Sequence, residues 1–287
     1  MTNLTTVGGI VTFNPDIDRL RENLEQALNQ VDHLVVVDNS SSNFELIASL
    51  LNEFADVSVV RNRVNGGIAI ALNQVMGWAL ERGASWALLL DQDSVIAPGM
   101  VGTLLASAEP STGIVCPTII DRSSTSGIPS NSRADVNYCI TSGSLCNVQV
   151  WESLGGYDEA IFIDFVDFDY CLRLREVGFR IVREPQATLL HEIGRISRHG
   201  RLIAYHHSAF RSYHMARDML YYAHKHRHAL HELKVQRRGL FGTYAVLLRK
   251  MLIISLFEED RVHRVTSIVR GTFSGTLALL SRAHTAL

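Results

Sequence analysis

The sequence has few cysteines and lacks the spacing that would make them a recognisable motif. Among 287 residues there are four, Cys116, Cys139, Cys146 and Cys171, and none belongs to a Cys-x-x-Cys pair. We also find no secretory signal peptide ahead of the first apolar segment. These absences argue against a paired-cysteine site and against an exported, disulfide-bonded protein. We expect reduced, mostly buried cysteines in a cytoplasmic protein.

Long apolar runs and phosphate-binding glycine turns are missing as well. No segment reaches the roughly 18 uninterrupted apolar residues of a spanning helix, because the closest run, Leu240 to Phe257, contains Arg249 and Lys250. There is no Gly-Lys-Ser/Thr P-loop. The expected first strand is followed by Phe13-Asn14-Pro15 instead of a glycine-rich turn, which excludes dinucleotide binding of the Rossmann type.

Charge is distributed unevenly along the chain. Residues 1–190 carry 11 basic and 23 acidic side chains, a net charge of -12. Residues 191–287 carry 16 basic and 6 acidic side chains, a net charge of +10, and 11 of the 12 histidines. A basic C-terminal third suggests an anionic partner. We do not expect nucleic acid, because the basic residues are not interleaved with aromatic ones.

Short apolar segments alternate with helical patterns through the first 120 residues. This alternation predicts an α/β fold with a mostly parallel central sheet flanked by helices. Beyond residue 200 the chain looks helical. The expected strands are 7–13, 33–38, 57–61, 86–90, 113–120, 180–183 and 187–191, and the expected helices are 16–30, a segment after 39–42, 67–82, a segment after residue 98, 148–154 and 166–177.

Polar residues follow three of these strands, and ligands bind at the carboxyl ends of strands in such sheets. Asp38 ends the second strand, and Asp91 and Asp93 follow the five apolar residues of the fourth. Two converging carboxylates suit Mg²⁺ or Mn²⁺, which prefer oxygen ligands. The alternative for an isolated Asp-x-Asp is a helix cap or a solvated loop.

The chain resembles family 2 glycosyltransferases with the GT-A fold, and within them the bacterial rhamnosyltransferases of cell-surface polysaccharide and lipopolysaccharide synthesis. The segments that carry this resemblance are Gly9–Pro15, Val36–Ser41, Asn65–Ala69 with Asn73, Leu90–Ser94, Thr141–Ser144, Gly155–Glu159, Phe162–Arg173 and His191–Gly194. The resemblance implies a catalytic domain at 1–220, with a Rossmann-like donor-binding half at about 1–120 and an acceptor half at about 121–220. A basic, amphipathic helical tail at 221–287 would follow.

The resemblance also assigns roles to individual residues. Asp93 and His191 would bind the divalent cation. Asp167 would be the catalytic base, although Val166 stands where the family usually has glutamate, and Asp164 or Asp169 could be confused with it. A packed histidine and a helix N-cap are the alternatives for His191 and Asp167. The nucleotide-sugar donor would contact Thr12, Phe13, Asp38, Asn65, Gly67, Asp91, His207 and Arg211.

The resemblance points to an inverting transferase that moves L-rhamnose from dTDP-L-rhamnose to a lipopolysaccharide core or lipid-linked glycan. Alternatives are a transferase of galactofuranose or a hexose from a UDP donor, a nucleotidyltransferase, and an inactive scaffold of a glycan-assembly complex. From about residue 235, apolar runs alternate with basic residues. This pattern suits a peripheral contact with the inner face of the plasma membrane, or helices packed on the domain or on a second subunit.

Overall fold

The computed structural model describes residues 5–121, 132–191, 196–199, 202–205, 207–232, 235, 237 and 239–285. The chain divides into two compact units, each with its own packing. The first, an α/β unit, comprises Met1–Glu159 and Tyr170–Glu192. The second, a mainly helical unit, comprises Ala160–Asp169 and Ile193–Leu287.

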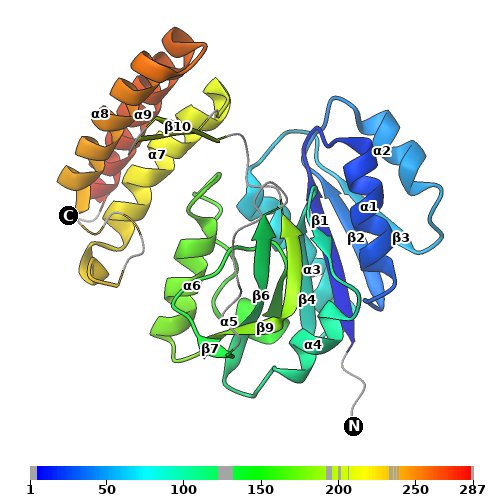
Figure 1. The fold of residues 1–287 in the computed structure, drawn as a ribbon. Coiled ribbons are helices and arrows are strands. Elements are labelled where there is room, and N and C mark those ends of the chain that lie inside the picture. The colour runs from blue at the N-terminus through cyan, green and yellow to red at the C-terminus, as the bar shows by residue number, and fades with distance from the viewer. Residues whose placement is uncertain are drawn as a thin grey trace. The chain divides into compact units, whose positions relative to one another are not determined.

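A mixed sheet of nine strands forms the centre of the α/β unit (Figure 1). Its order is β3-β2-β1-β4-β8-β6-β9-β5, with β7 paired to β9. Strands β3, β2, β1 and β4 run parallel, as do β6 and β9, while β8, β5 and β7 are antiparallel to their neighbours. The strands are β1 (Thr6–Thr12), β2 (His33–Asp38), β3 (Val57–Arg61), β4 (Trp86–Asp91), β5 (Val95–Ile96), β6 (Thr112–Asp121), β7 (Ala134–Asp135), β8 (Ser144–Asn147) and β9 (Arg180–His191).

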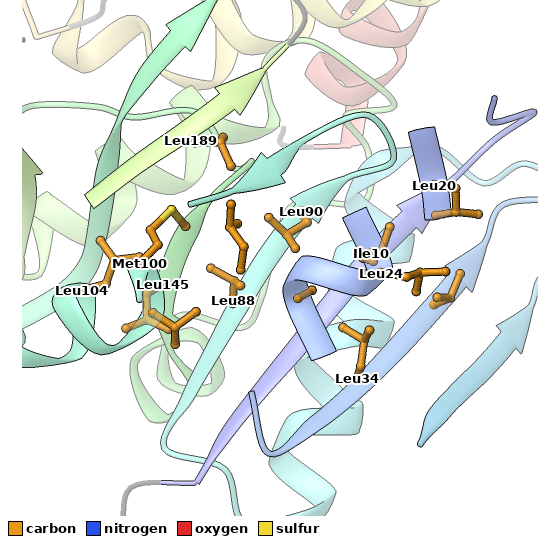
Figure 2. Packing of buried hydrophobic residues seen from close by; sticks show 14 of the residues in the cluster. Ile10, Leu20, Leu24, Leu34, Leu88, Leu90, Met100, Leu104, Leu145 and Leu189 are labelled. Atoms are coloured by element: carbon orange, nitrogen blue, oxygen red, sulfur yellow. The ribbon is translucent and has the colours of Figure 1, made fainter. Parts of the chain in front are cut away.

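One face of the sheet packs against α1 (Ile17–Leu28), α2 (Phe44–Leu51) and α4 (Met100–Ala106). Asp16 caps α1 by accepting hydrogen bonds from two backbone N–H groups of its first turn. The strands contribute alternate residues to this face, since successive side chains of a strand point to opposite sides. Figure 2 shows the resulting core, in which the labelled side chains are Ile10, Leu20, Leu24, Leu34, Leu88, Leu90, Met100, Leu104, Leu145 and Leu189.

The opposite face is covered by α3 (Ile68–Glu81) and the C-terminal part of α6 (Val166–Glu176). Glycine permits the closest approach: a Cβ at Gly9 of β1 would lie 2.1 Å from Cγ1 of Val75 in α3. The glycines within the first strand are therefore packing residues. Gly9 lets α3 approach β1, and Gly8 makes room for the side chains of Leu34 and Val31.

The helical unit contains β10 (Ile196–His199) and β11 (Leu202–Tyr205), which form an antiparallel pair, and three long helices. These are α7 (Ala209–Lys225), α8 (Gly239–Phe257) and α9 (Arg261–Thr285), with the short 3₁₀ helix η1 (Arg227–Ala229) after α7. Helices α7 and α9 approach closely, since a Cβ at Gly271 would lie 2.2 Å from the backbone oxygen of Tyr213.

The expected α/β architecture, with flanking and C-terminal helices, is confirmed, and most predicted strands and helices lie within a few residues of their positions. Three expectations need correction. The two strands expected at 180–183 and 187–191 are one strand, β9, whose pairing with β6 shifts register. The chain beyond residue 200 is not wholly helical, because β11 lies there, and we did not expect β5, β7 or β8.

The third correction concerns α8. Among the described residues it is the one helix long and apolar enough to cross a membrane by length and composition, with 19 residues and a mean hydropathy of 1.7. We did not expect this, because Arg249 and Lys250 interrupt its apolar run. The expected domain boundary at residue 220 lies within α7, and the division into a catalytic domain and a tail stays a prediction.

Candidate active site

The polar ends of β1, β2 and β4 lie together at one edge of the sheet. Thr12 pairs with Asp38 in the parallel register of β1 and β2, and Val11 pairs with Asp91 in that of β1 and β4. Side-chain hydrogen bonds join the loops beyond these strands, including one from the backbone N–H of Phe13 to Oε1 of Gln92 at 2.8 Å. The shared edge expected from the sequence is confirmed.

Asp38 is a buried hydrogen-bond acceptor at this edge. The hydroxyl of Thr12 donates to Oδ1 at 3.1 Å, and the backbone N–H of Ser41 donates to Oδ2 at 3.0 Å. Thr12 and Asp38 are both 0% exposed, whereas the Phe13 ring beside them is exposed. Phe13 is therefore the residue of this group that presents a surface. For Asp38 to contact the nucleobase of a donor, as predicted, the neighbouring groups that bury its carboxylate would have to move.

Asn65 and Gly67 lie in the loop before α3, where another asparagine organises the backbone. Asn39 donates to the carbonyl of Gly67 at 3.0 Å and accepts from the N–H of Gly66 at 3.1 Å. Asn65 accepts from the N–H of Gly67 at 3.0 Å. Gly67 has a φ of 93°, a value that favours glycine. These bonds fix the loop at the carboxyl edge of β2.

Asp91, Asp93 and His191 form the group that could hold a metal. One ligand atom from each can be chosen so that all three lie within 4.8 Å of one another. His191 Nδ1 is 3.8 Å from Asp93 Oδ1, with the two side chains 17% and 36% exposed. Two carboxylates and an imidazole suit Mg²⁺ or Mn²⁺ with positions left for phosphate oxygens. Asp91, predicted to contact the donor, belongs to this group as well.

Two serines support the metal-binding group, and the sequence did not reveal their role. Ser94 is buried, and its Oγ lies 2.9 Å from His191 Nδ1 and 2.6 Å from Oγ of Ser142. Ser142 also accepts from the backbone N–H of Asp91 at 3.0 Å. Ser94 therefore positions the imidazole at Nδ1, the nitrogen that lies 3.8 Å from Asp93 Oδ1. The signal that could have revealed them was their place in the Leu90–Ser94 and Thr141–Ser144 segments.

Asp167 lies in the first turn of α6, within the part of that helix that belongs to the helical unit. Its side chain is half-buried. Two other acids close to it in the sequence form ion pairs. Asp169 is buried against Lys225 Nζ at 2.5 Å and His226 Nε2 at 2.8 Å. Asp164 pairs with Arg211. These ion pairs disfavour Asp164 and Asp169 as the base, and the assignment of Asp167 stays a prediction.

His207 and Arg211 also belong to the helical unit, at the start of α7. Arg211 pairs with Asp164, and burial together with the positive charge of Arg211 lowers the pKa of His207 to about 4. A neutral imidazole would not compensate a diphosphate charge at neutral pH. The predicted donor contacts of both residues lie on a different unit from the metal-binding group and stay predictions.

A further acid in α7, Asp218, shapes the segment before α6. Its Oδ2 accepts hydrogen bonds from the backbone N–H groups of Phe162 and Ile163 at 2.7 and 3.0 Å. Burial raises the pKa of Asp218 to about 6, while the neighbouring Arg217 and these N–H groups oppose the rise. Arg217 also donates to the carbonyl of Ala160 at 3.1 Å. These two side chains hold the segment that leads to Asp167.

Comparison with known proteins decides the family. The model of "Glycosyl transferase family 2" matches residues 9–167, more than half of the chain. The chain belongs to glycosyl transferase family 2. A curated relative, "dTDP-rhamnosyl transferase RfbF" of Shigella flexneri, is 30% identical over 203 residues, which cover 64% of this chain and 68% of the relative. The protein is thus a family 2 glycosyltransferase, and the nucleotidyltransferase alternative is set aside.

Solved structures show the same fold at low identity. S. aureus TarS 1-349 has a TM-score of 0.59 and 10% identity, covering 94% of this chain and 81% of TarS 1-349. The same TarS fragment in complex with UDP-GlcNAc has a TM-score of 0.57 and 12% identity, covering 94% and 82%. GalNAc-T7 with UDP, GalNAc and Mn²⁺ has a TM-score of 0.56 and 15% identity, and the match covers 67% of this chain but only 44% of GalNAc-T7. The glycosyltransferase therefore has the GT-A fold.

Proposed function

We propose that this glycosyltransferase moves L-rhamnose from dTDP-L-rhamnose to an acceptor hydroxyl, with inversion at C1 of the sugar. The sugar is supported by the name of the Shigella flexneri relative and by the sequence of the Asp91–Ser94 and Phe162–Arg173 segments. The observation that carries the metal-assisted reaction is the convergence of Asp91, Asp93 and His191. The alternative is another sugar on a UDP donor, because TarS was crystallised with UDP-GlcNAc.

The residues of the chain would divide the work between donor and acceptor. Asp93 and His191 would hold the divalent cation, and Asp91 lies close enough to share it. When bound, the cation supplies positive charge for the departing diphosphate. Thr12, Phe13 and Asp38 would border the nucleoside, and Asn65 and Gly67 would lie against the nucleotide. Asp167 would take the proton of the acceptor hydroxyl as the oxygen attacks C1.

We further propose a lipopolysaccharide core or lipid-linked glycan as acceptor, reached by a peripheral contact with the inner face of the plasma membrane. Exposed apolar side chains recur at intervals of three, four or seven residues along α8 and α9, which places them in one stripe on each helix. Basic residues at exposed positions accompany them. The stripe residues are Phe241, Leu248, Leu252 and Leu256 in α8, and Val262, Val269, Phe273, Leu277 and Leu280 in α9.

A helix lying in the interface is favoured over a helix crossing the bilayer. Although α8 is long enough to span, Arg249 and Lys250 stand at its centre. A basic residue at the bilayer centre costs about 3 kcal/mol on insertion scales, so two would offset much of the apolar gain. In the interface, each well-placed basic residue gains about 1 kcal/mol from anionic lipids.

A panel of nucleotide sugars tests the donor proposal. The melting temperature and donor hydrolysis of the full chain are measured with dTDP-L-rhamnose, UDP-galactofuranose and UDP-glucose, each with Mg²⁺, with Mn²⁺ and with EDTA. We expect stabilisation and turnover only with dTDP-L-rhamnose and a divalent cation, and loss of both effects in Asp93→Asn. Turnover that persists in EDTA would overturn the metal assignment, whereas preference for a UDP sugar would overturn rhamnose alone.

A further inference from the structure

The helical unit contains a cavity whose lining includes one predicted donor residue, His207, but no predicted metal ligand and no predicted catalytic base. It has a volume of about 270 Å³ and lies among α7, α8 and α9. Ser212 of α7, Arg249 and Lys250 of α8, and Arg264 of α9 contribute its polar lining, with Glu258 between α8 and α9. His207 lies at the same cavity. Every lining residue belongs to the helical unit.

The lining carries an excess of positive charge. Glu258 pairs with Arg264, and both are buried. Arg249 and Lys250 add two further cations without adding an acid to the lining. Burial lowers the pKa of Lys250. A bound anion would raise this pKa again, because it favours the charged ammonium. Lys250 Nζ lies 3.1 Å from the sulfur of Met215, which is a weak hydrogen-bond acceptor.

A buried hydroxyl supplies independent evidence for a ligand. Ser212 is 1% exposed and lines the cavity, and its Oγ has no hydrogen-bond partner. Buried polar atoms in folded proteins are nearly always satisfied, because a buried group without a hydrogen-bond partner destabilises the fold. A ligand oxygen in the cavity would accept a hydrogen bond from this hydroxyl. The same oxygen would be an acceptor for the cations of α8.

The remaining lining is apolar, which a site for a free inorganic anion would not need. Met215, Val246, Ile253 and Ile254 contribute it. A volume of about 270 Å³ is many times the roughly 10–15 Å³ that one water molecule needs. The cavity therefore has room for a phosphate group together with the first carbons of an attached chain.

We propose that this cavity binds a phosphate ester that carries an apolar chain, with Lys250 and Arg249 compensating the phosphate charge and Ser212 donating a hydrogen bond. Isoprenoid phosphates and phospholipids share this chemistry. The site goes beyond the proposed transfer reaction and does not depend on which sugar the enzyme moves. It would hold a lipid at helices whose outer faces carry the apolar stripes.

Calorimetric titration of the full chain tests the site without any sugar donor. The probes are geranyl phosphate and dihexanoyl phosphatidic acid, both below their micelle concentrations, with inorganic phosphate and geraniol as partial ligands. We expect an intact phosphate ester to bind at least tenfold more tightly than either partial ligand. The tighter of the two esters identifies the source. The proposal is overturned if inorganic phosphate binds as tightly as both esters. It is also overturned if neither ester binds.

Variants locate the binding within the cavity. Lys250→Gln should weaken the ester about tenfold or more, as expected for loss of a charge-assisted contact, and Ser212→Ala should weaken it several-fold. Arg270→Gln removes the same charge from an exposed position of α9 outside the cavity and should leave affinity unchanged. Circular dichroism confirms that each variant is folded. Equal losses in Lys250→Gln and Arg270→Gln would mean diffuse surface attraction and would overturn the site.

Discussion

Ser94→Ala is the substitution that most directly tests how the metal-binding group is built. The change removes one oxygen from a buried position and leaves Asp91, Asp93 and His191 in place. It breaks the 2.9 Å contact with His191 Nδ1 and the 2.6 Å contact with Ser142. The imidazole would lose the partner that fixes its orientation and its tautomer. Loss of such a supporting contact typically weakens metal binding by about 10- to 100-fold.

The structure favours the lower end of that range. His191 is only 17% exposed, so neighbouring side chains still restrict the ring after the contact is lost. We therefore expect Mn²⁺ affinity to fall about tenfold, or about 1.4 kcal/mol, and transfer at subsaturating metal to fall in proportion. Excess metal should restore most of the activity, because no predicted metal ligand is removed.

Mn²⁺ titration followed by calorimetry measures the effect on the full chain. Ser107→Ala is the matched control, because Ser107 is also buried and donates to Glu184 at 2.6 Å, away from the metal-binding group. Both variants should lose comparable stability, whereas only Ser94→Ala should lose metal affinity. Unchanged Mn²⁺ binding in Ser94→Ala would mean that Ser94 does not position His191, and tighter binding would mean that Ser94 competes with the metal for His191. Either result would refute the reasoning.

Four other perturbations have defined outcomes. Asp167→Asn should retain donor binding in calorimetry but lose transfer, and surviving transfer would assign another base. Gly9→Ala should lower the free energy of unfolding in urea by about 2 kcal/mol or more, because its methyl group would lie 2.1 Å from a valine of α3. The control Gly77→Ala should not lower the free energy of unfolding, because its added Cβ meets nothing within 4 Å. Burial lowers the pKa of His214 to about 4, so the protein loses stability as the pH falls from 6.5 towards 4. Unfolding followed by circular dichroism should show that His214→Phe loses less stability over that range than the unmodified protein does. Leu252→Glu should reduce flotation with anionic vesicles while the protein stays folded, and undiminished flotation would contradict the stripe as the membrane contact.

Local patterns predicted much of the fold because they describe which faces of each element are buried. The five apolar residues before Asp91 define a buried strand, and β4 occupies that position. The same reasoning failed for β8, because Ser144–Asn147 is too short to show a period and its pairing partners are distant in sequence. It also divided β9 at Glu184 to Gln186, where the irregular register with β6 accommodates the polar residues.

The sequence by itself determined which strands end in polar residues, and which acids belong at one edge of the sheet. Tertiary structure decided what holds those acids. His191 reaches Ser94 across 97 residues, and Ser142 reaches the backbone of Asp91 across 51. Only a folded sheet joins such segments, because β8 must pair with β4 before Ser142 can approach Asp91. Tertiary structure likewise brought together the residues of α7, α8 and α9 that line the cavity, since helical periodicity shows which face of a helix is buried but not which helix packs against it.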